Sequence, residues 1–168
     1  RVAQRLELPV FDAGLVGEAG GVETDGHGTL LAHESTFINP NRNTGSKAEV
    51  EAMLLDTMGA DKMIWAPGIK GADITDYHID ALARFVKPGQ VLIQMGDEID
   101  PQDPWSVAAF ETHGILAEAA DAVLLVTARN PRDELYRDLQ ARRGDWDSAG
   151  IKSVRVIGDA NAPGTIAA

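Results

Sequence analysis

Residues 46–59 carry the strongest secondary-structure signal in the chain. Ser46 and Glu49 have the spacing of a capping box, in which each side chain accepts a hydrogen bond from the other residue's backbone amide at a helix start. Apolar residues then recur every three or four positions, and Gly59 provides a stop. The pattern predicts a helix over 47–58.

The segments that flank this helix have the composition of strands. Short apolar runs occur near 21–24 and 28–33, separated by the turn dipeptide Asp25-Gly26. KMIWA at 62–66 ends in a Pro-Gly turn, and the runs ALARFV and QVLIQM flank the turn sequence KPGQ. Strand, helix, strand and then hairpin is the order of a ββαβ-like unit, so the sequence predicts an α/β fold.

The rest of the chain predicts a boundary and a second set of elements. The segment 97–104 is acidic, contains two prolines and has the composition of a linker. We therefore expect a domain over 1–104, a junction over 105–118 and a C-terminal βαβ-like segment over 119–168. The other expected elements are a short strand at 8–13, a helix beginning near 105, a buried strand at 122–128, a helix from Asn130-Pro131 to Gly144, and a strand at 153–159.

The charge of the chain narrows its possible partners. It has 26 Asp and Glu against 15 Lys and Arg, a formal net charge of −11. Nucleic acids and anionic membranes require clustered Lys and Arg, so a small cationic ligand is the better match. No apolar run approaches the roughly 18 to 20 residues of a membrane span, and the first residues lack a signal-peptide pattern. We therefore expect a cytoplasmic protein.

The chain contains no cysteine. Disulfides, thiolate zinc sites and any reaction with a thiolate nucleophile from this chain are therefore excluded. Histidines and acids are available for a different metal site, but no pair has the i, i+4 spacing that favours one on a helix, so we expect none. The residues considered are His27, His33, His78, Asp25 and Asp76.

The segment TDYHID, residues 75–80, concentrates polar chemistry ahead of an apolar run. If it is extended, Asp76, His78 and Asp80 alternate onto one face, because side chains in a strand repeat every two residues. Carboxylates suit a guanidinium, which forms two parallel hydrogen bonds to one carboxylate, and an imidazole beside them can transfer protons. The alternative is a polar turn with local hydrogen bonds only. Arg42, in NPNRN, is expected to be structural, paired with backbone carbonyls or an acid.

Three separated motifs occur in an order that resembles one known family. GEAGGVETDGHGTLLAHESTFINPNRN, GADKMIWAPG and ITDYHIDALARFVKPGQVLI resemble the middle of agmatine deiminases and bacterial peptidylarginine deiminases, over about residues 1–104. The resemblance implies part of an αβ-propeller of the guanidino-group-modifying type, which is a ring of ββαβ units around a central site. It also implies hydrolysis of a guanidinium C–N bond, in arginine or polyamine metabolism and putrescine biosynthesis.

The same resemblance implies roles for individual residues. His78 takes the place of the family's general acid/base, Asp80 that of a guanidinium clamp and Glu18 that of the site glutamate. Asp76 is expected as a further ligand-binding acid from the alternation within TDYHID alone. Ala19 and Tyr77 stand where the family commonly has glycine. The ligand implied is agmatine or an arginine-like compound, and no cofactor is implied.

The family's Trp-x-Arg-Asp element and its nucleophilic cysteine have no counterpart in this sequence. We therefore expect a fragment that is inactive by itself, because the thiolate would have to come from a missing partner segment. A non-catalytic binding module for a cationic guanidino ligand is the alternative. Strand edges and apolar surface left uncovered also predict self-association or marginal folding.

The tail, about residues 119–168, resembles a second family. It looks like the C-terminal end of the dinucleotide-binding portion of flavin oxidoreductases of the trimethylamine dehydrogenase and dienoyl-CoA reductase type. Gly158 and Asp159 would then contact flavin or ADP, since glycine lets the backbone approach a ligand and a helix start favours phosphate. The first Gly-x-Gly-x-x-Gly unit is absent, so this is half of a site at most.

Overall fold

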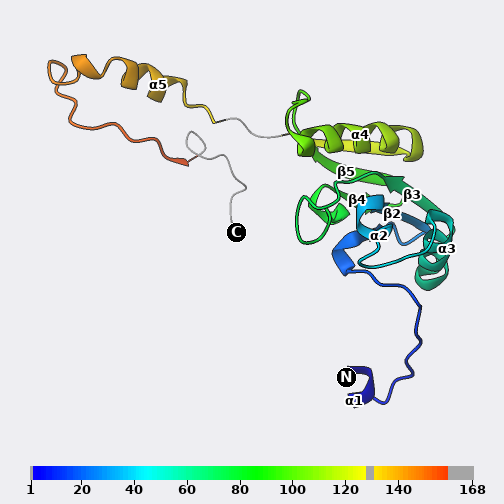
Figure 1. The fold of residues 1–168 in the computed structure, drawn as a ribbon. Coiled ribbons are helices and arrows are strands. Elements are labelled where there is room, and N and C mark those ends of the chain that lie inside the picture. Colours follow the sequence, from blue (N-terminus) through cyan, green and yellow to red (C-terminus); the bar gives the residue numbers. More distant parts are fainter. Residues whose placement is uncertain (1, 128–130, 159–168) are drawn as a thin grey trace. The chain divides into compact units, whose positions relative to one another are not determined.

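A computed structural model describes residues 2–127 and 131–158 of the chain. The chain divides into two compact units, Arg1–Thr127 and Ala128–Ala168, and each is considered by itself (Figure 1). The first unit contains two three-stranded sheets with the strand orders β1-β2-β3 and β4-β5-β6.

The first sheet surrounds the helix that the capping box predicts. β1 (Val22–Thr24) pairs antiparallel with β2 (Thr29–His33), and β2 pairs in parallel with β3 (Lys62–Ala66). The chain between β2 and β3 forms α2 (Glu34–Phe37) and α3 (Lys47–Met58). Both hydrogen bonds of the capping box are present, and Gly59 ends α3 in the left-handed conformation with φ of 63°. The predicted helix and its flanking strands are confirmed.

The second sheet repeats this order of elements. β4 (Ala83–Lys87) pairs antiparallel with β5 (Gln90–Met95), and β6 (Ala122–Thr127) pairs in parallel with β5 after the helix α4 (Pro104–Ala119). The first unit is therefore two successive ββαβ repeats. No residue period reveals this repeat in the sequence, because it is conserved in topology only.

The helix α4 corrects the predicted boundary at 105–118. Asp103 caps it by accepting a hydrogen bond from the Trp105 amide at 3.0 Å. Its buried residue Leu116 belongs to the same apolar cluster as Ile64 of the first sheet and Ile93 of the second. The acidic segment before it is thus a helix-capping turn instead of a linker, and the boundary between the units follows Thr127.

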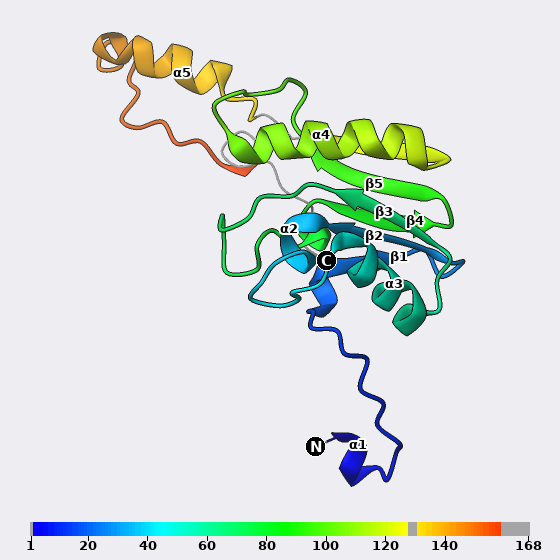
Figure 2. The ribbon, with the colours of Figure 1, turned by 45° about the vertical axis from the view of Figure 1, so that its right-hand side comes forward.

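Both faces of β2 are buried. Leu30 and Ala32 point into a cluster with Phe37, Val50 and Leu54 of α2 and α3. Leu31 lies between them on the opposite face of β2 and points into the cluster that α4 covers. Figure 2 accordingly shows α3 and α4 on opposite sides of the strands. The carboxyl end of β2 is therefore held rigidly from two directions.

Several predicted elements differ from those observed. Residues 8–13 form no strand, and the short helix α1 (Val2–Arg5) precedes them. In the second unit, α5 (Glu134–Ala141) begins after Asp133 instead of at Pro131, whereas Asn130 lies outside the described residues. Residues 153–157 of the expected strand form no strand, and Asp159 at its end lies outside the described residues. Two short 3-10 helices of the first unit, η1 (Ala19–Gly21) and η2 (Ile79–Ala81), were not anticipated, and a third, η3 (Arg143–Asp145), follows α5.

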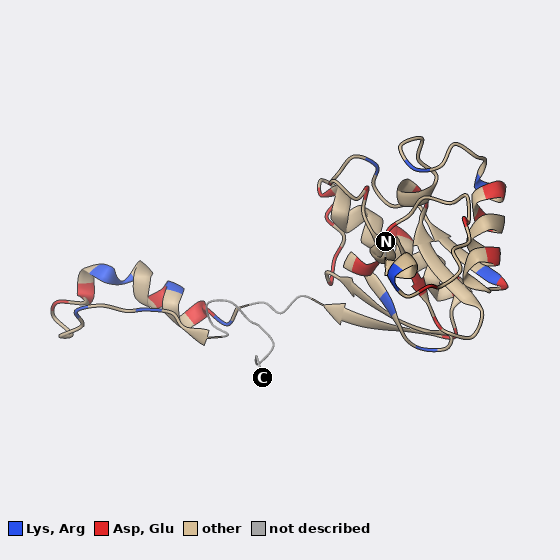
Figure 3. Ribbon diagram, turned by 90° about the horizontal axis from the view of Figure 1, so that it is seen from below, with Lys and Arg blue, Asp and Glu red and all other residues tan. Residues whose placement is uncertain are grey.

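The strand β6 was predicted to be buried, and this is wrong. It lies at the edge of its sheet, and the side chains of Leu124, Leu125 and Val126 are 45%, 51% and 43% exposed. β6 contains no charged residue, so its ribbon carries neither colour in Figure 3, whereas the outer face of α3 is marked by acids. Edge strands without charges expose unpaired backbone groups to other chains.

We expect the 168-residue chain to self-associate through this edge, and Leu125→Lys to reduce the association. A lysine on the edge interferes with strand pairing between molecules. Sedimentation velocity over a range of protein concentrations measures the effect, with Ile74→Lys as the control because Ile74 is 98% exposed in a loop. A wild-type chain that is monomeric at every concentration would contradict this expectation.

Candidate guanidinium site

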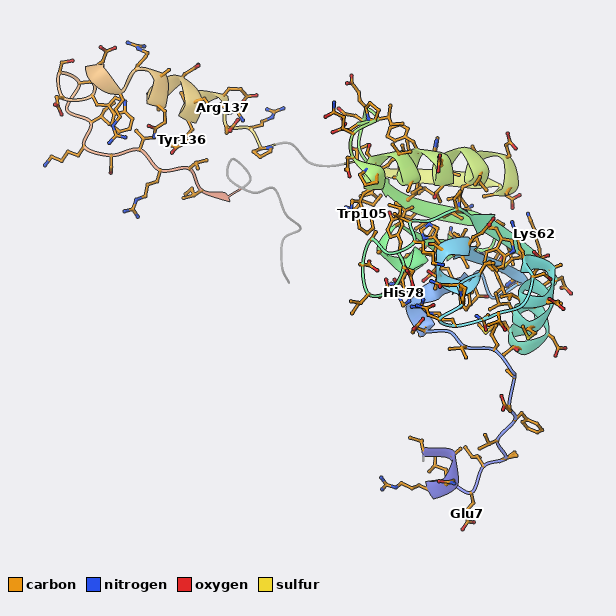
Figure 4. All side chains as sticks on the ribbon, in the orientation of Figure 1. Glu7, Lys62, His78, Trp105, Tyr136 and Arg137 are labelled. Carbon is orange, nitrogen blue, oxygen red and sulfur yellow. The ribbon has the colours of Figure 1, made fainter. Side chains whose placement is uncertain are left out.

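The candidate site lies where two short 3-10 helices pack together. Glu18 immediately precedes η1, which leads into β1. His78 immediately precedes η2, which contains Asp80 and leads into β4. Figure 4 labels His78 on the loop that joins the first sheet to the second. Both repeats therefore contribute to the site.

Glu18, His78 and Asp80 converge around Gly20. Glu18 Oε2 lies 3.3 Å from His78 Nε2. A Cβ atom placed on Gly20 would lie 2.7 Å from His78 Nδ1 and 2.8 Å from Asp80 Oδ2, closer than real Cβ atoms approach. A side chain at position 20 would therefore displace the imidazole or the carboxylate, whereas glycine lets η1 approach both. The structure brings together three of the four residues that the sequence predicts for this site.

These three side chains differ in their access to solvent. The Glu18 side chain is 50% exposed and the His78 side chain 14% exposed, while Asp80 is an exposed residue. Within residues 2–127 and 131–158, no hydrogen bond to the Asp80 carboxylate is observed. A cation from solvent can therefore reach the Asp80 carboxylate and the exposed side of Glu18. Both lie next to the mostly buried imidazole of His78.

The segment before His78 is a tight turn, which corrects the predicted alternation of Asp76, His78 and Asp80 along a strand. Asp76 and Tyr77 have positive φ angles of 56° and 67°, a backbone conformation that residues other than glycine rarely adopt. The backbone reverses here, and the Asp76 carboxylate contacts Arg42 and Asn39, with no hydrogen bond to His78 among the described residues. Local alternation fails because contacts from elsewhere in the fold impose the turn.

Polar side chains from the end of β2 and from α2 hold this turn. Ser35 Oγ donates to the Asp76 carbonyl at 2.6 Å, and Thr36 Oγ1 donates to the Tyr77 carbonyl at 3.1 Å. His33 Nδ1 lies 2.7 Å from the same Tyr77 carbonyl, and the His33 side chain is fully buried. Burial, opposed by this hydrogen bond, lowers the pKa of His33, so a neutral imidazole that donates from Nδ1 fits the site.

The Asp76 carboxylate is occupied by internal donors, so it does not act as the ligand-binding acid that the sequence predicts. It accepts hydrogen bonds from Arg42 Nη1 at 2.7 Å, Asn39 Nδ2 at 2.8 Å and the Gly71 amide at 2.8 Å, with Asn41 Nδ2 at 3.3 Å. The Arg42 hydrogen bond, followed by that of Gly71, holds the pKa of Asp76 below its ordinary value. Asp76 is therefore a buried, ionised structural acid.

Arg42 has the structural role that the sequence predicts. Its Nε donates to Glu18 Oε2 at 2.8 Å and to Oε1 at 3.1 Å, and its Nη2 donates to the Thr75 carbonyl at 3.2 Å. The hydrogen bond from Arg42 is the main reason that the pKa of Glu18 lies below its ordinary value. The clamp formed by His33, Ser35 and Thr36 was missed, although polar residues directly after an apolar strand are a usable signal.

The remaining sequence candidates lie elsewhere. Asp25 Oδ1 accepts hydrogen bonds from the His27 and Thr29 amides of its own turn. In the part of the chain that the structure describes, no group of three or more His, Asp and Glu residues is arranged to hold a metal ion. Gly158 has a positive φ of 60°, whereas Asp159 lies outside the described residues. The flavin or ADP contact of the tail stays a prediction.

The repeated ββαβ topology places two carboxylates beside an imidazole in an α/β protein. A sequence profile of the Porphyromonas-type peptidyl-arginine deiminase family matches residues 1–141. The chain belongs to this family. The match includes α4 and β6, so it extends beyond the predicted boundary at residue 104, and it also runs past Thr127 to the end of α5.

Curated and solved relatives agree with this assignment. A Yersinia pestis protein named "Putative agmatine deiminase" is 40% identical over 124 residues, which are 73% of this chain and 33% of that protein. The solved agmatine deiminase of Enterococcus faecalis superposes with a TM-score of 0.65 at 25% identity, covering 76% of this chain and 37% of that one. A C. jejuni agmatine deiminase variant with substrate bound gives 0.59 at 27% identity, covering 68% and 34%. The chain thus spans about a third of the length of these relatives.

Proposed function

We propose that this chain supplies one part of the guanidinium-binding and proton-transfer site of an agmatine deiminase-like hydrolase. The observation that carries the proposal is the convergence of Glu18, His78 and Asp80 around Gly20. Agmatine or a related small guanidino compound is the proposed ligand. The names of the relatives support this choice, since one solved relative is an agmatine deiminase with substrate bound.

Each residue has a role that follows from its environment. Asp80, which is exposed, can accept two parallel N–H hydrogen bonds from a guanidinium. Glu18 supplies a second negative charge through its exposed side. His78 lies within 3.3 Å of Glu18, and a proton on its ring can pass to the nitrogen that leaves as ammonia.

The complete reaction needs one component that these 168 residues do not contain. Hydrolysis of the guanidinium C–N bond requires a nucleophile at the central carbon, then water, and ammonia leaves with a proton from the acid. The chain has no cysteine to serve as a thiolate nucleophile. We therefore expect it to bind the ligand without turning it over, as a binding module would.

The wider setting of this function is also proposed. Deimination of agmatine belongs to polyamine metabolism on the route to putrescine, and we propose that it takes place in the cytoplasm. Across residues 2–127 and 131–158, no helix has the length and apolar character that crossing a membrane requires. The relationship to agmatine deiminases supports the pathway, and the family fold that we propose for the whole protein is the αβ-propeller.

Isothermal titration calorimetry with agmatine tests the proposal. We expect saturable binding that weakens at least about tenfold in Asp80→Asn, because a hydrogen-bonded charge is worth about 1.5–3 kcal/mol. Asp97→Asn is the matched control, since Asp97 is an exposed acid outside the site and its replacement removes the same charge. An ammonia assay on the same samples is expected to detect none.

Two results would reject the proposal. One is the absence of saturable binding by the folded wild-type chain. The other is an equal loss of affinity in Asp80→Asn and Asp97→Asn, which would indicate general attraction of a cation to an acidic protein. Ammonia release by the wild-type chain would contradict the need for an external nucleophile.

A further inference from the structure

Arg42 lies between the two segments that form the proposed site. Its side chain is only 6% exposed, and its guanidinium contacts the carboxylates of Glu18 and Asp76 at 2.8 and 2.7 Å. Glu18 belongs to the segment that enters β1, and Asp76 to the turn before β4. One planar cation thus bridges two segments that are far apart in the sequence.

The first consequence concerns the orientation of Glu18. Both of its carboxylate oxygens receive the Arg42 Nε–H, and the nearer oxygen, Oε2, also faces His78 Nε2. A half-exposed glutamate otherwise samples several staggered rotamers. Arg42 restricts Glu18 to a rotamer that meets the imidazole.

The second consequence concerns the backbone that carries His78. Arg42 Nη2 donates to the Thr75 carbonyl at 3.2 Å, and the His78 amide donates to Thr75 Oγ1 at 3.2 Å. The Arg42 contact to Asp76 fixes the next residue of the same turn. Arg42 therefore acts on both partners of the contact between Glu18 and His78.

We propose that Arg42 is a positioning residue of the site, which holds the Glu18 carboxylate against His78 and keeps Asp76 out of ligand binding. An external guanidinium is then left with Asp80 and the exposed side of Glu18. Arg42 itself does not touch the ligand. This inference rests on the proposed function, because that function makes Glu18 and His78 parts of a ligand site. The contacts of Arg42 can be tested without any ligand.

Carbon-detected NMR of the side-chain carboxyl groups in the 168-residue chain provides the test. In Arg42→Gln, we expect the titration midpoint of Glu18 to rise toward the ordinary value for glutamate, because the hydrogen bond that lowers it is lost. Arg42→Lys keeps the positive charge but loses the planar fork, so we expect a smaller rise. Arg84→Gln is the control, since it removes an exposed arginine that pairs with Glu23, and the Glu18 midpoint should not move. An unchanged midpoint in Arg42→Gln would overturn the proposal.

A second measurement uses only the wild-type chain, in case Arg42→Gln does not fold. We expect the Arg42 Nε–H to exchange with solvent at least about tenfold more slowly than the Arg84 Nε–H. Both groups donate to a carboxylate, but the Arg42 side chain is buried whereas that of Arg84 is 64% exposed. Equal exchange rates would overturn the proposal.

Agmatine titration then separates this inference from the proposed function. If agmatine does not bind and Arg42 behaves as expected, the ligand is wrong and the positioning role stands. Agmatine binding that is unchanged in a folded Arg42→Gln chain would reject a role for Arg42 in the site. A loss of affinity that Arg42→Lys partly restores supports it.

Discussion

Asp76→Asn is expected to lower the free energy of unfolding by about 3 kcal/mol at pH 7, the usual cost of breaking one side of a buried ion pair. The side chains of Asp76 and Arg42 are 9% and 6% exposed. An asparagine cannot supply the negative charge opposite Arg42, and its NH2 group would face either the Gly71 amide, which donates to Oδ1, or the Asn39 amide group, which donates to Oδ2. Urea unfolding followed by circular dichroism measures the change.

The pH dependence provides an internal control for this variant. The pKa of Asp76 in the folded chain lies below the ordinary 3.8, so its stabilisation is complete above that value and is lost as the pH falls through the lowered pKa. The difference between wild type and Asp76→Asn should therefore shrink below about pH 4. Glu23→Gln, which breaks the more exposed pair with Arg84, should cost no more than about 1 kcal/mol. Equal effects of Asp76→Asn and Glu23→Gln at pH 7 would contradict the buried-pair interpretation.

Tyr77→Gly is expected to destabilise the chain by about 2 kcal/mol, although glycine adopts the positive φ of position 77 more readily than tyrosine. Loss of a large buried aromatic side chain costs about 3–5 kcal/mol, and glycine regains about 1–2 kcal/mol because position 77 has a positive φ. The Tyr77 ring packs 4.6 Å from the His33 ring and 4.5 Å from the Trp105 ring, and the residue is 5% exposed. Thermal and urea unfolding measure the net effect.

Tyr77→Phe separates the ring from the hydroxyl. We expect a small change at pH 7, because the hydroxyl has no hydrogen-bond partner among the described residues. Burial, together with the charges of Asp103 and Asp73, raises the pKa of Tyr77 from 10.0 to about 12. The unfolded chain therefore loses this proton first, and wild-type stability falls as the pH rises from about 10 to about 12. Tyr77→Phe should reduce that fall. A gain in stability for Tyr77→Gly would show that backbone strain outweighs ring packing.

Local sequence signals were sufficient where local physics determines the structure. The helix α3 is specified by Ser46, Glu49 and Gly59, all within 14 residues, and the strands around it follow from short apolar runs and turns. These elements alone predict an α/β chain with a ββαβ unit. His78 and Asp80 were identified from the TDYHID pattern and from the resemblance, and Glu18 from the resemblance alone; the structure brings the three together.

Local signals failed where distant residues determine the structure. The turn at Asp76 and Tyr77 depends on His33, Ser35 and Thr36, which lie about 40 positions earlier in the chain. Alternation along TDYHID therefore gave Asp76 the wrong direction. Likewise, the apolar run of β6 does not specify whether another element covers it. Pro101 precedes a helix and Pro104 begins it, so these prolines do not separate domains.

The contact between Glu18 and His78 joins residues that are 60 positions apart. The entropic cost of closing so long a loop rises only slowly with its length. The chain must nevertheless lose this entropy before the contact between Glu18 and His78 can stabilise the fold. We therefore expect the geometry of the site to form late in folding, after the strands on both sides of the loop have paired. A peptide that contains only TDYHID would lack the carboxylate partner and the αL turn, so the His-x-Asp motif has its chemistry only within the folded domain.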